Sequence, residues 1–299
     1  MRLLTVRHVT TYRYSEPVKF GEHRMMFRPR ESHDLRLVST KLEILPRASD
    51  LRWLHDVFDN SVAIATFDEA ASELRFDSTV TLEHIHTPLP DYALEVGART
   101  YPFHYSDDEG PDLVRALTRH YPDDDLVPWT AQFLTESGST TTMALLHSMT
   151  RGIKDEFVYL RRKEKGVQSP GETLRCRSGS CRDFAVLMME AARSLGIAAR
   201  FVSGYIFVPG LDPCASVGGG ATHGWMQAYL PGAGWVDFDP TNSIVGNRNL
   251  IRVAVAWDQR NALPLWGTFI GPATSFRSMH VDVSVTEETG GRAAAASIG

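Results

Sequence analysis

Three residues in the second half of the chain have side chains that could together perform nucleophilic catalysis. Cys181 lies in the segment GSCRDFA (179–185), His223 in THGW (222–225) and Asp239 in GWVDFDPT (234–241). A cysteine at a helix start ionises readily, a histidine can take up the thiol proton, and a carboxylate can hold the Nδ1–H of that histidine. The order of thiol, imidazole and carboxylate predicts a cysteine-nucleophile acyl-transfer enzyme.

Each of these residues also has an ordinary structural interpretation. Cys181 could be a small apolar residue at a helix start, His223 a hydrogen-bonded structural histidine, and Asp239 a turn residue before proline. The Gly224-Trp225 pair favours a cleft, because a small residue and an aromatic wall adjoin the imidazole. The position of Asp239 at a strand end favours a role in orienting His223. The catalytic hypothesis therefore ranks above the structural one.

The sequence around these residues predicts the elements that position them. After Cys181, apolar residues recur at spacings of three and four up to Leu195, and Gly196 stands where a helix commonly ends. Predicted strands follow at residues 198–208, 224–230 and 234–238. The last two strands are joined by a hairpin-like turn. We expect an α+β fold with Cys181 at a helix N-terminus, packed on an antiparallel sheet.

The rest of the chain divides by its periodicity. Residues 1–90 alternate between apolar and polar, which predicts an N-terminal β-sandwich-like module of antiparallel strands. Proline residues in segment 87–91 mark the expected domain boundary. Residues 91–285 form the expected catalytic domain, with a helical lead-in, and residues 286–299 an expected disordered tail. The lead-in helices are expected at 112–120, 126–136 and 140–157, before a loop at 161–172.

Composition excludes several classes of function. The formal net charge of -5 and the scattered Lys and Arg residues argue against nucleic acid as a partner. No run reaches the roughly 18 apolar residues of a membrane helix, so no membrane association is expected. Charged residues interrupt the start of the chain, which argues against a secretory signal. The odd number of cysteines, 3, argues against a disulfide scaffold and fits a reducing cytoplasm.

A metal site is the main chemical alternative. Its ligands would be Cys176, Cys181, Cys214 and His223, the residue types that zinc prefers. Their spacing lacks a close cysteine pair, so neither a metal nor another cofactor is expected. Other notable residues favour structural roles: Asp183 as a first-turn carboxylate, and Trp225 and Trp235 as core residues or cleft walls.

Four motifs carry a resemblance to a known family. They are Gly179-x-Cys181-x-Asp183-x-Ala185, Gly204-Tyr205, His223-x-Trp225 and Trp235-x-x-x-Asp239-Pro240-Thr241. The segment from about 172 to 243 resembles the transglutaminase-like core of the papain-like superfamily. The first ~90 residues, with HVTTYRY at 8–14, are similar to the N-terminal module of bacterial transglutaminase-like cysteine proteases. The resemblance thus covers nearly the whole chain.

The resemblance implies a nucleophile at Cys181, a general base and acid at His223, and an orienting carboxylate at Asp239. It also implies a peptide or amide substrate, a thioester intermediate and, as the leading expectation, hydrolysis by a protease or amidase. The alternatives are transfer to an amine, as in a transglutaminase, and a non-catalytic peptide-binding module. Gly224 and Gln227 depart from the common bacterial pattern, which has Ala and Glu there, so the resemblance implies the reaction class better than the substrate.

Overall fold

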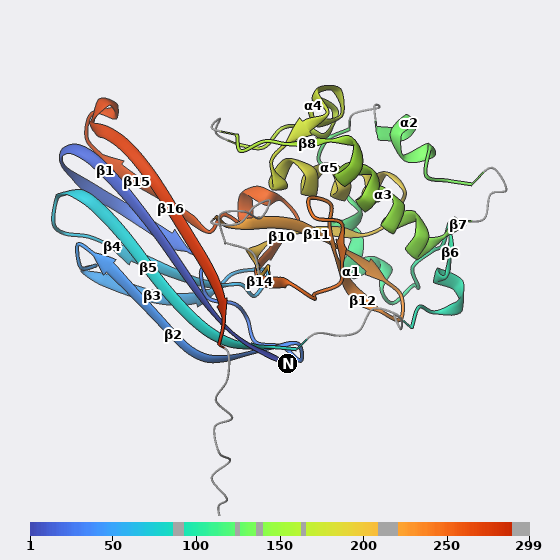
Figure 1. The fold of residues 1–299 in the computed structure, drawn as a ribbon, viewed down its shortest axis with the longest axis horizontal. Coiled ribbons are helices and arrows are strands. Elements are labelled where there is room, and N and C mark those ends of the chain that lie inside the picture. The colour runs from blue at the N-terminus through green and yellow to red at the C-terminus, as the bar shows by residue number, and fades with distance from the viewer. Residues whose placement is uncertain (86–92, 123–125, 136–139, 163–165, 209–220, 289–299) are drawn as a thin grey trace, which may run out of the picture.

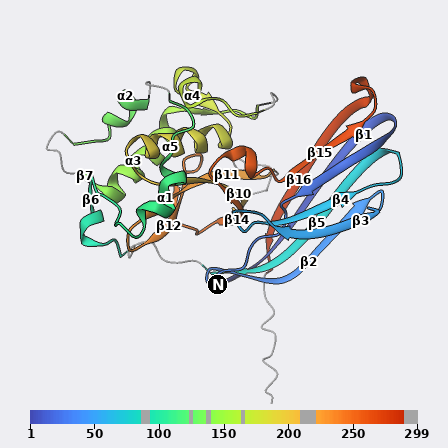
Figure 2. The same ribbon diagram turned by 180° about the vertical axis from the view of Figure 1, so that it is seen from behind.

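The fold is taken from a computed structural model, which describes residues 1–85, 93–122, 126–135, 140–162, 166–208 and 221–288. Two large sheets, two small two-stranded sheets and a group of helices make up the described residues. The long strands of the first sheet lie at one end and the helices at the other, with the second sheet between them (Figure 1). The same order of layers is seen from behind in Figure 2.

The first sheet has seven strands. They are β1 (Arg2–Met25), β2 (Leu35–Leu45), β3 (Asp50–His55), β4 (Ser61–Thr66), β5 (Ala71–His84), β15 (Leu265–Ile270) and β16 (Phe276–Glu287). The first half of β1 pairs with β5 and β16, and its second half with β4 and β15. Alternate residues of β5 are buried, as the period-two pattern predicts. Apolar side chains from both halves, such as Phe20 and Phe76, share one core.

The last two strands of the chain complete this N-terminal sheet. Strand β16 lies antiparallel to β1, with Leu4 opposite Glu287 and Tyr14 opposite Phe276. The second domain was expected to extend to residue 285, but it does not. The local sequence pattern could not indicate this, because pairing between such distant segments leaves no trace in it. Thr286 and Glu287 are strand residues and not part of a tail. The expected boundary at 87–91 and residues 289–299 lie outside the described residues.

The second sheet carries the predicted site residues. Its strand order is β13-β12-β11-β10-β14. The strands are β10 (Ala199–Ile206), β11 (His223–Leu230), β12 (Gly234–Asp239), β13 (Ile244–Val245) and β14 (Leu250–Ala256). The turn between β11 and β12 contains Gly232, and β12 begins at Gly234; their φ angles of 86° and 70° lie in a backbone region that suits glycine. This turn sets the register that places Met226 opposite Phe238.

Five helices accompany this sheet within the described residues. They are α1 (Gly110–Leu117), α2 (Leu126–Ala131), α3 (Thr142–Glu156), α4 (Pro170–Cys176) and α5 (Cys181–Ser194). Two-residue strands β6 (Thr100–Tyr101) and β7 (Thr140–Thr141) pair with each other, as do β8 (Val158–Tyr159) and β9 (Ser178–Gly179). Helix α5 begins at Cys181 as predicted and packs its apolar residues against β11 and β10. The predicted loop at 161–172 is shorter, because α4 begins at Pro170.

The two sheets are packed against each other through β10 and β14. Alternate residues of β14 point in opposite directions, so that Ala254 joins the helix core and Val253 joins a second core with the N-terminal sheet. Polar contacts fix the same interface. The Nδ1 atom of His8 lies 2.9 Å from the Tyr205 hydroxyl, and Asn60 exchanges two hydrogen bonds with the backbone of Val255. The N-terminal sheet is thus a fixed support for the second sheet.

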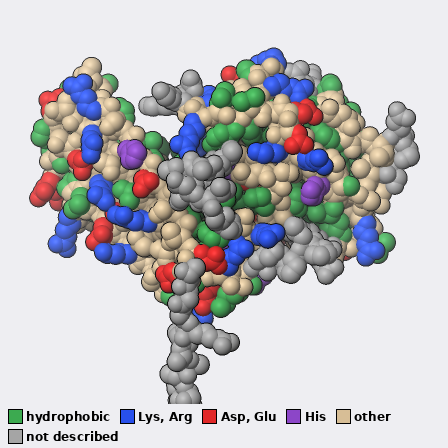
Figure 3. Space-filling model, viewed as in Figure 1, with side chains coloured by type: hydrophobic (Ala, Val, Ile, Leu, Met, Phe, Trp, Pro, Cys, Tyr) green, Lys and Arg blue, Asp and Glu red, His purple; other side chains and the backbone are tan. Residues whose placement is uncertain are grey.

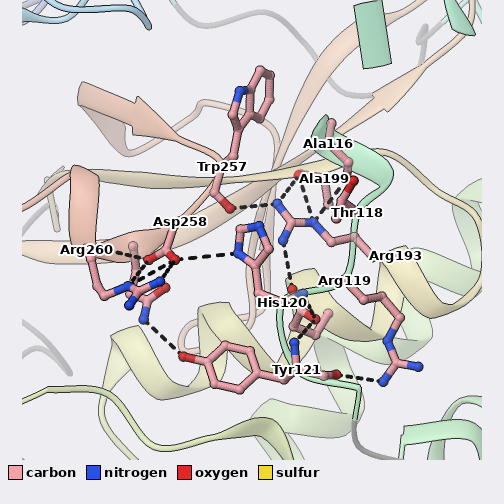
Figure 4. A network of polar contacts seen from close by, with 12 residues as sticks. Ala116, Thr118, Arg119, His120, Tyr121, Arg193, Ala199, Trp257, Asp258 and Arg260 are labelled. Atoms are coloured by element: carbon pink, nitrogen blue, oxygen red, sulfur yellow. Dashed lines mark hydrogen bonds and ion pairs between the residues drawn. The ribbon is translucent and has the colours of Figure 1, made fainter. Parts of the chain in front are cut away.

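A buried ion pair joins the second half of α5 to its surroundings (Figure 4). Glu190 and Arg193 are fully buried and lie 2.8 Å apart. The Arg193 guanidinium donates to the carbonyl oxygens of Ala116, Ala199 and Trp257. It therefore ties α5 to α1, to the start of β10 and to the segment after β14.

The outer surface carries charges of both signs. On the face in Figure 3, Lys and Arg side chains are interspersed with Asp and Glu side chains over the N-terminal sheet. Within the described residues, no helix combines the length and the apolar character needed to cross a membrane.

Candidate active site

Cys181 is the first residue of α5, and a capping interaction defines this helix start. The Ser180 backbone N–H donates to Asp183 Oδ2 at 2.7 Å, and the Ser180 hydroxyl donates to the same oxygen at 2.8 Å. The Ser180 side chain also accepts the Asp183 backbone N–H, and this contact and the one from the Ser180 N–H together form a capping box. The N–H groups of the first helical turn have no carbonyl partner within the helix, so they favour an anion beside Cys181.

Asp183 is occupied as a structural carboxylate. Its side chain is fully buried, and its Oδ1 accepts from the Gln168 N–H at 2.7 Å and from Arg162 at 3.0 Å. Gly179 allows this packing, since a Cβ there would lie 2.8 Å from the Asp183 Cβ. The first-turn role expected for Asp183 agrees with these contacts, since both of its oxygens already accept hydrogen bonds.

His223 and Asp239 lie on neighbouring strands and contact each other. His223 is the first residue of β11 and Asp239 the last of β12, and the His223 Nε2 atom lies 2.8 Å from Asp239 Oδ2. The Thr241 N–H and the Asn242 side chain also donate to Asp239, at 2.9 and 2.8 Å. The carboxylate is thus fixed by three donors, and it fixes one orientation of the imidazole.

The ring nitrogen held by Asp239 is not the expected one. We expected Nδ1, but the carboxylate engages Nε2. Nδ1 has no hydrogen-bond partner within the described residues. The imidazole also interacts with the Cys181 thiol, and this interaction affects the pKa of both groups. The structure thus brings all three predicted residues together.

The electrostatics favour a thiolate and an imidazolium. Burial opposes charge on both groups, but contact with His223, the charge of Arg182 and the Gly224 N–H together lower the pKa of Cys181. Burial likewise lowers the pKa of His223, yet Asp239 and Cys181 outweigh it and raise that pKa to about 10. Burial would raise the pKa of Asp239, but the His223 charge keeps it below its usual value. Both shifts favour a Cys181 thiolate paired with a His223 imidazolium at neutral pH.

Trp225 supports the imidazole from one side. The two rings are stacked with centroids 5.9 Å apart and an interplanar angle of 26°. The indole is fully buried, and its Nε1 donates to Asp237 Oδ1 at 2.6 Å. Gly224 is equally constrained, because a Cβ there would lie 3.0 Å from the Phe201 ring and 3.2 Å from Arg182 Cγ. Trp225 is therefore a core residue that also forms the wall behind His223.

Two residues near the thiol were not predicted from the sequence. Tyr159 belongs to the two-residue strand β8, and burial, followed by the charge of Cys181, raises its pKa to about 12. Arg182 lies over the Phe201 ring at 5.7 Å and donates to the Ser203 hydroxyl at 3.4 Å. Strand β8 is too short to produce a periodic pattern in the sequence, so nothing there pointed to Tyr159. Arg182 could have been noticed, because it is next to Cys181 in the sequence.

The zinc alternative gains no support from the described residues. Cys176 is exposed near the end of α4, whereas Cys181 is buried at the start of α5. Cys214 lies outside the described residues. Within the described ranges, no three His, Cys, Asp or Glu side chains gather as a metal site would need.

A pH experiment distinguishes the ion pair from two neutral groups. Between pH 6.5 and about 9, the folded wild type carries one more proton on His223 and one fewer on Cys181 than the unfolded chain does. These two differences cancel, so the stability of the wild type changes little with pH. In Cys181→Ala only the contribution of His223 to the free energy of unfolding remains. This contribution is fully present below pH 6.5 and is lost as the pH rises. We expect urea unfolding to show that Cys181→Ala loses up to about 1.4 kcal/mol per pH unit above 6.5. Parallel profiles for the two proteins would contradict the ion pair.

The fold and the arrangement of Cys181, His223 and Asp239 define a class of cysteine-dependent enzymes. Residues 4–83 match the bacterial transglutaminase-like N-terminal region, and residues 130–240 match the transglutaminase-like superfamily. The chain belongs to the transglutaminase-like superfamily and carries the N-terminal region of its bacterial members. This membership confirms the resemblance inferred from the motifs.

Individual relatives extend the comparison over most of the chain. The uncharacterized protein Rv2569c of Mycobacterium tuberculosis is 27% identical over 293 residues, which cover 94% of this chain and 90% of that protein. The uncharacterized protein ML0607 of Mycobacterium leprae is 33% identical over 120 residues, 40% of this chain and 42% of that protein. The crystal structure of a putative cysteine protease from Cytophaga hutchinsonii superposes with a TM-score of 0.66 at 19% sequence identity. The match covers 95% of this chain and 90% of that chain. This likeness confirms the α+β fold.

Proposed function

We propose that this protein transfers an acyl group through a thioester on Cys181. In this proposal His223 is the general base and acid, and Asp239 is the carboxylate that orients the imidazole. The observation that carries the proposal is the placement of His223, whose Nε2 is held by Asp239 at 2.8 Å while the ring interacts with the thiol. This is the arrangement that an activated cysteine nucleophile needs.

The reaction follows from the charges of the resting site. The Cys181 thiolate attacks the carbonyl carbon of an amide and forms a carbon–sulfur bond. The proton on His223 Nδ1 passes to the leaving nitrogen as the carbon–nitrogen bond breaks, which leaves a thioester and a neutral imidazole. An attacking water then gives a proton back to His223, the carbon–sulfur bond breaks, and the thiolate returns. The products are a carboxylic acid and an amine.

The start of α5 supplies the donors for the intermediate. Negative charge develops on the carbonyl oxygen during attack, and the first-turn N–H groups have no partner within the helix. The N–H of Cys181 itself is one of them. The helix start thus both lowers the pKa of the thiol and stabilises the oxyanion.

We propose hydrolysis of a peptide or amide bond as the overall reaction. Water needs no binding site of its own to reach the thioester, whereas an amine acceptor needs a site that also keeps water out. Transfer to an amine is the alternative reaction at the same residues.

The proposal is tested by comparing wild type with Cys181→Ala on a peptide library, with and without a primary-amine probe. We expect wild type to release free acid from a subset of peptides and Cys181→Ala to release none. Mass spectrometry distinguishes the acid from the amide formed with the probe. A dominant probe conjugate would replace hydrolysis by amine transfer.

The same experiment addresses a non-catalytic binding module. Peptides that bind equally to wild type and Cys181→Ala, with no covalent adduct on the wild-type thiol, would overturn the enzymatic proposal. Exposed Cys176 serves as the internal reference for thiol labelling in both proteins.

A further inference from the structure

A pocket lies away from Cys181, between the N-terminal sheet and the second sheet. Its volume is about 590 Å³, a usual size for a small-ligand site. The loop after β1 and Phe58 form one side, and Arg200, Trp235 and Arg252 form the other. Arg200 lies four residues before Gly204, which is opposite His223. That separation is about 13 Å along the strand, so the pocket is distinct from the thiol site.

Arg200 is the central charge in this pocket. Its guanidinium lies over the Trp235 ring at 4.1 Å, and its Nε donates to Gln227 Oε1 at 2.9 Å. Within the described residues it has no carboxylate at ion-pair distance, and its other N–H groups have no hydrogen-bond acceptor. Burial lowers the pKa of Arg200 to about 9, so the group remains charged at neutral pH. A half-buried cation with unused donors favours a bound anion.

The protein does not supply that anion from its nearest carboxylate. Asp237 lies opposite Gln227, and Oδ1 of Asp237 accepts from the Gln227 amide at 2.9 Å and from the Trp225 indole at 2.6 Å. Gln227 is thereby oriented with its oxygen toward Arg200 and stands between Arg200 and Asp237. Burial raises the pKa of Asp237, which further weakens it as a counter-ion.

The other acids that line the pocket are also occupied. Asp34 accepts from Asn247 at 3.0 Å and lies 3.7 Å from Arg252. Glu31 accepts the Leu37 N–H at 3.0 Å. The further cation of the lining, Arg30, is paired with Asp59 at 2.6 Å. Arg200 is therefore the cation of the pocket lining whose unused N–H groups would donate hydrogen bonds to a ligand.

Part of the remaining wall of the pocket is apolar. Phe58, Val253 and Val255 line it together with the Trp235 ring that carries Arg200. A guanidinium matches the two oxygens of a carboxylate, and the apolar wall suits a hydrocarbon body. We propose that this pocket binds a small organic carboxylate, with its oxygens on Arg200 and its apolar part against Phe58 and Val255.

The test uses the full chain and two probes of equal shape. Benzoate carries the carboxylate, and benzamide replaces it with an uncharged amide. We expect isothermal titration at pH 7 to show saturable benzoate binding, with benzamide at least tenfold weaker. Equal binding of the two probes would overturn the proposal, as would inorganic phosphate binding more tightly than benzoate.

Matched variants assign the binding to this pocket. Arg200→Gln is expected to weaken benzoate binding at least tenfold, and Arg200→Lys severalfold, because lysine keeps the charge but loses the paired donors. Arg36→Gln, at an exposed arginine, is expected to bind as wild type does. Cys181→Ala is also expected to bind normally, which separates this site from the proposed catalysis. If Arg200→Gln does not fold, wild-type affinity in Arg200→Lys refutes the proposal.

Discussion

Replacing His223 with alanine is expected to slow alkylation of Cys181 by iodoacetamide at pH 7 by at least ~30-fold. Contact with His223 and its charge are the largest of the effects that lower the pKa of Cys181, and burial opposes them. Without the imidazolium, the thiol returns to an ordinary pKa of about 8.5 or above, where only about 3% is thiolate at pH 7. The wild-type thiol is expected to be mostly ionised at that pH. Mass-spectrometric labelling rates measure the difference.

The exposed Cys176 gives the control in the same tube. Its labelling rate should be unchanged by His223→Ala, because it lies near the end of α4, outside the contact between His223 and Asp239. Labelling of Cys181 in the variant should recover as the pH is raised to 9 and 10. Equal rates for Cys181 in wild type and variant at pH 7 would show that the imidazole does not ionise the thiol. Asp239→Asn should give an intermediate rate, since Asp239 raises the pKa of His223.

The site was predictable because its determinants are local. The Ser180–Asp183 capping box and the apolar spacing after Cys181 fix the helix start within a few residues. The turn at Gly232 and Gly234 likewise fixes the β11–β12 register, and with it the proximity of His223 to Asp239. Local backbone chemistry therefore specified that Cys181 begins a helix and that His223 lies near Asp239.

The features that escaped prediction depend on distant segments or on side-chain orientation. The pairing of β16 with β1 joins the two ends of the chain. The choice of Nε2 over Nδ1 depends on how the His223 ring is turned in its packed surroundings. The pocket at Arg200 forms only when the loop after β1 meets the second sheet. A single sequence records none of these contacts in its periodicity.

The position of Cys181 depends on both ends of α5. Its first turn is fixed by Asp183, and its second half by the buried pair of Glu190 and Arg193. Arg193 donates to Ala199 at the start of β10, the strand that pairs with β11 and therefore with His223. The ion pair thus helps to hold the helix that bears the thiol against the sheet that bears the imidazole.

Replacing Glu190 with alanine is expected to destabilise the protein by about 3 to 5 kcal/mol, the usual cost of breaking a buried ion pair from one side. Glu190 Oε1 accepts from Arg193 at 2.8 Å, and Oε2 accepts from the N–H groups of His120 and Tyr121 at 2.9 and 3.1 Å. The variant would leave a buried guanidinium uncompensated and two backbone donors without acceptors. Urea unfolding followed by circular dichroism measures the loss.

Glu156→Ala is the matched control, because Glu156 is also a helix residue that pairs with an arginine, Arg177, but its side chain is 43% exposed. We expect that change to cost less than about 1 kcal/mol. Glu190→Gln should fall between the two, since it keeps an acceptor but loses the charge. A Glu190→Ala protein as stable as the control would mean that water hydrates Arg193 in its place. The ion pair would then contribute nothing to the position of Cys181, and the alkylation rate of that thiol should also stay at the wild-type value.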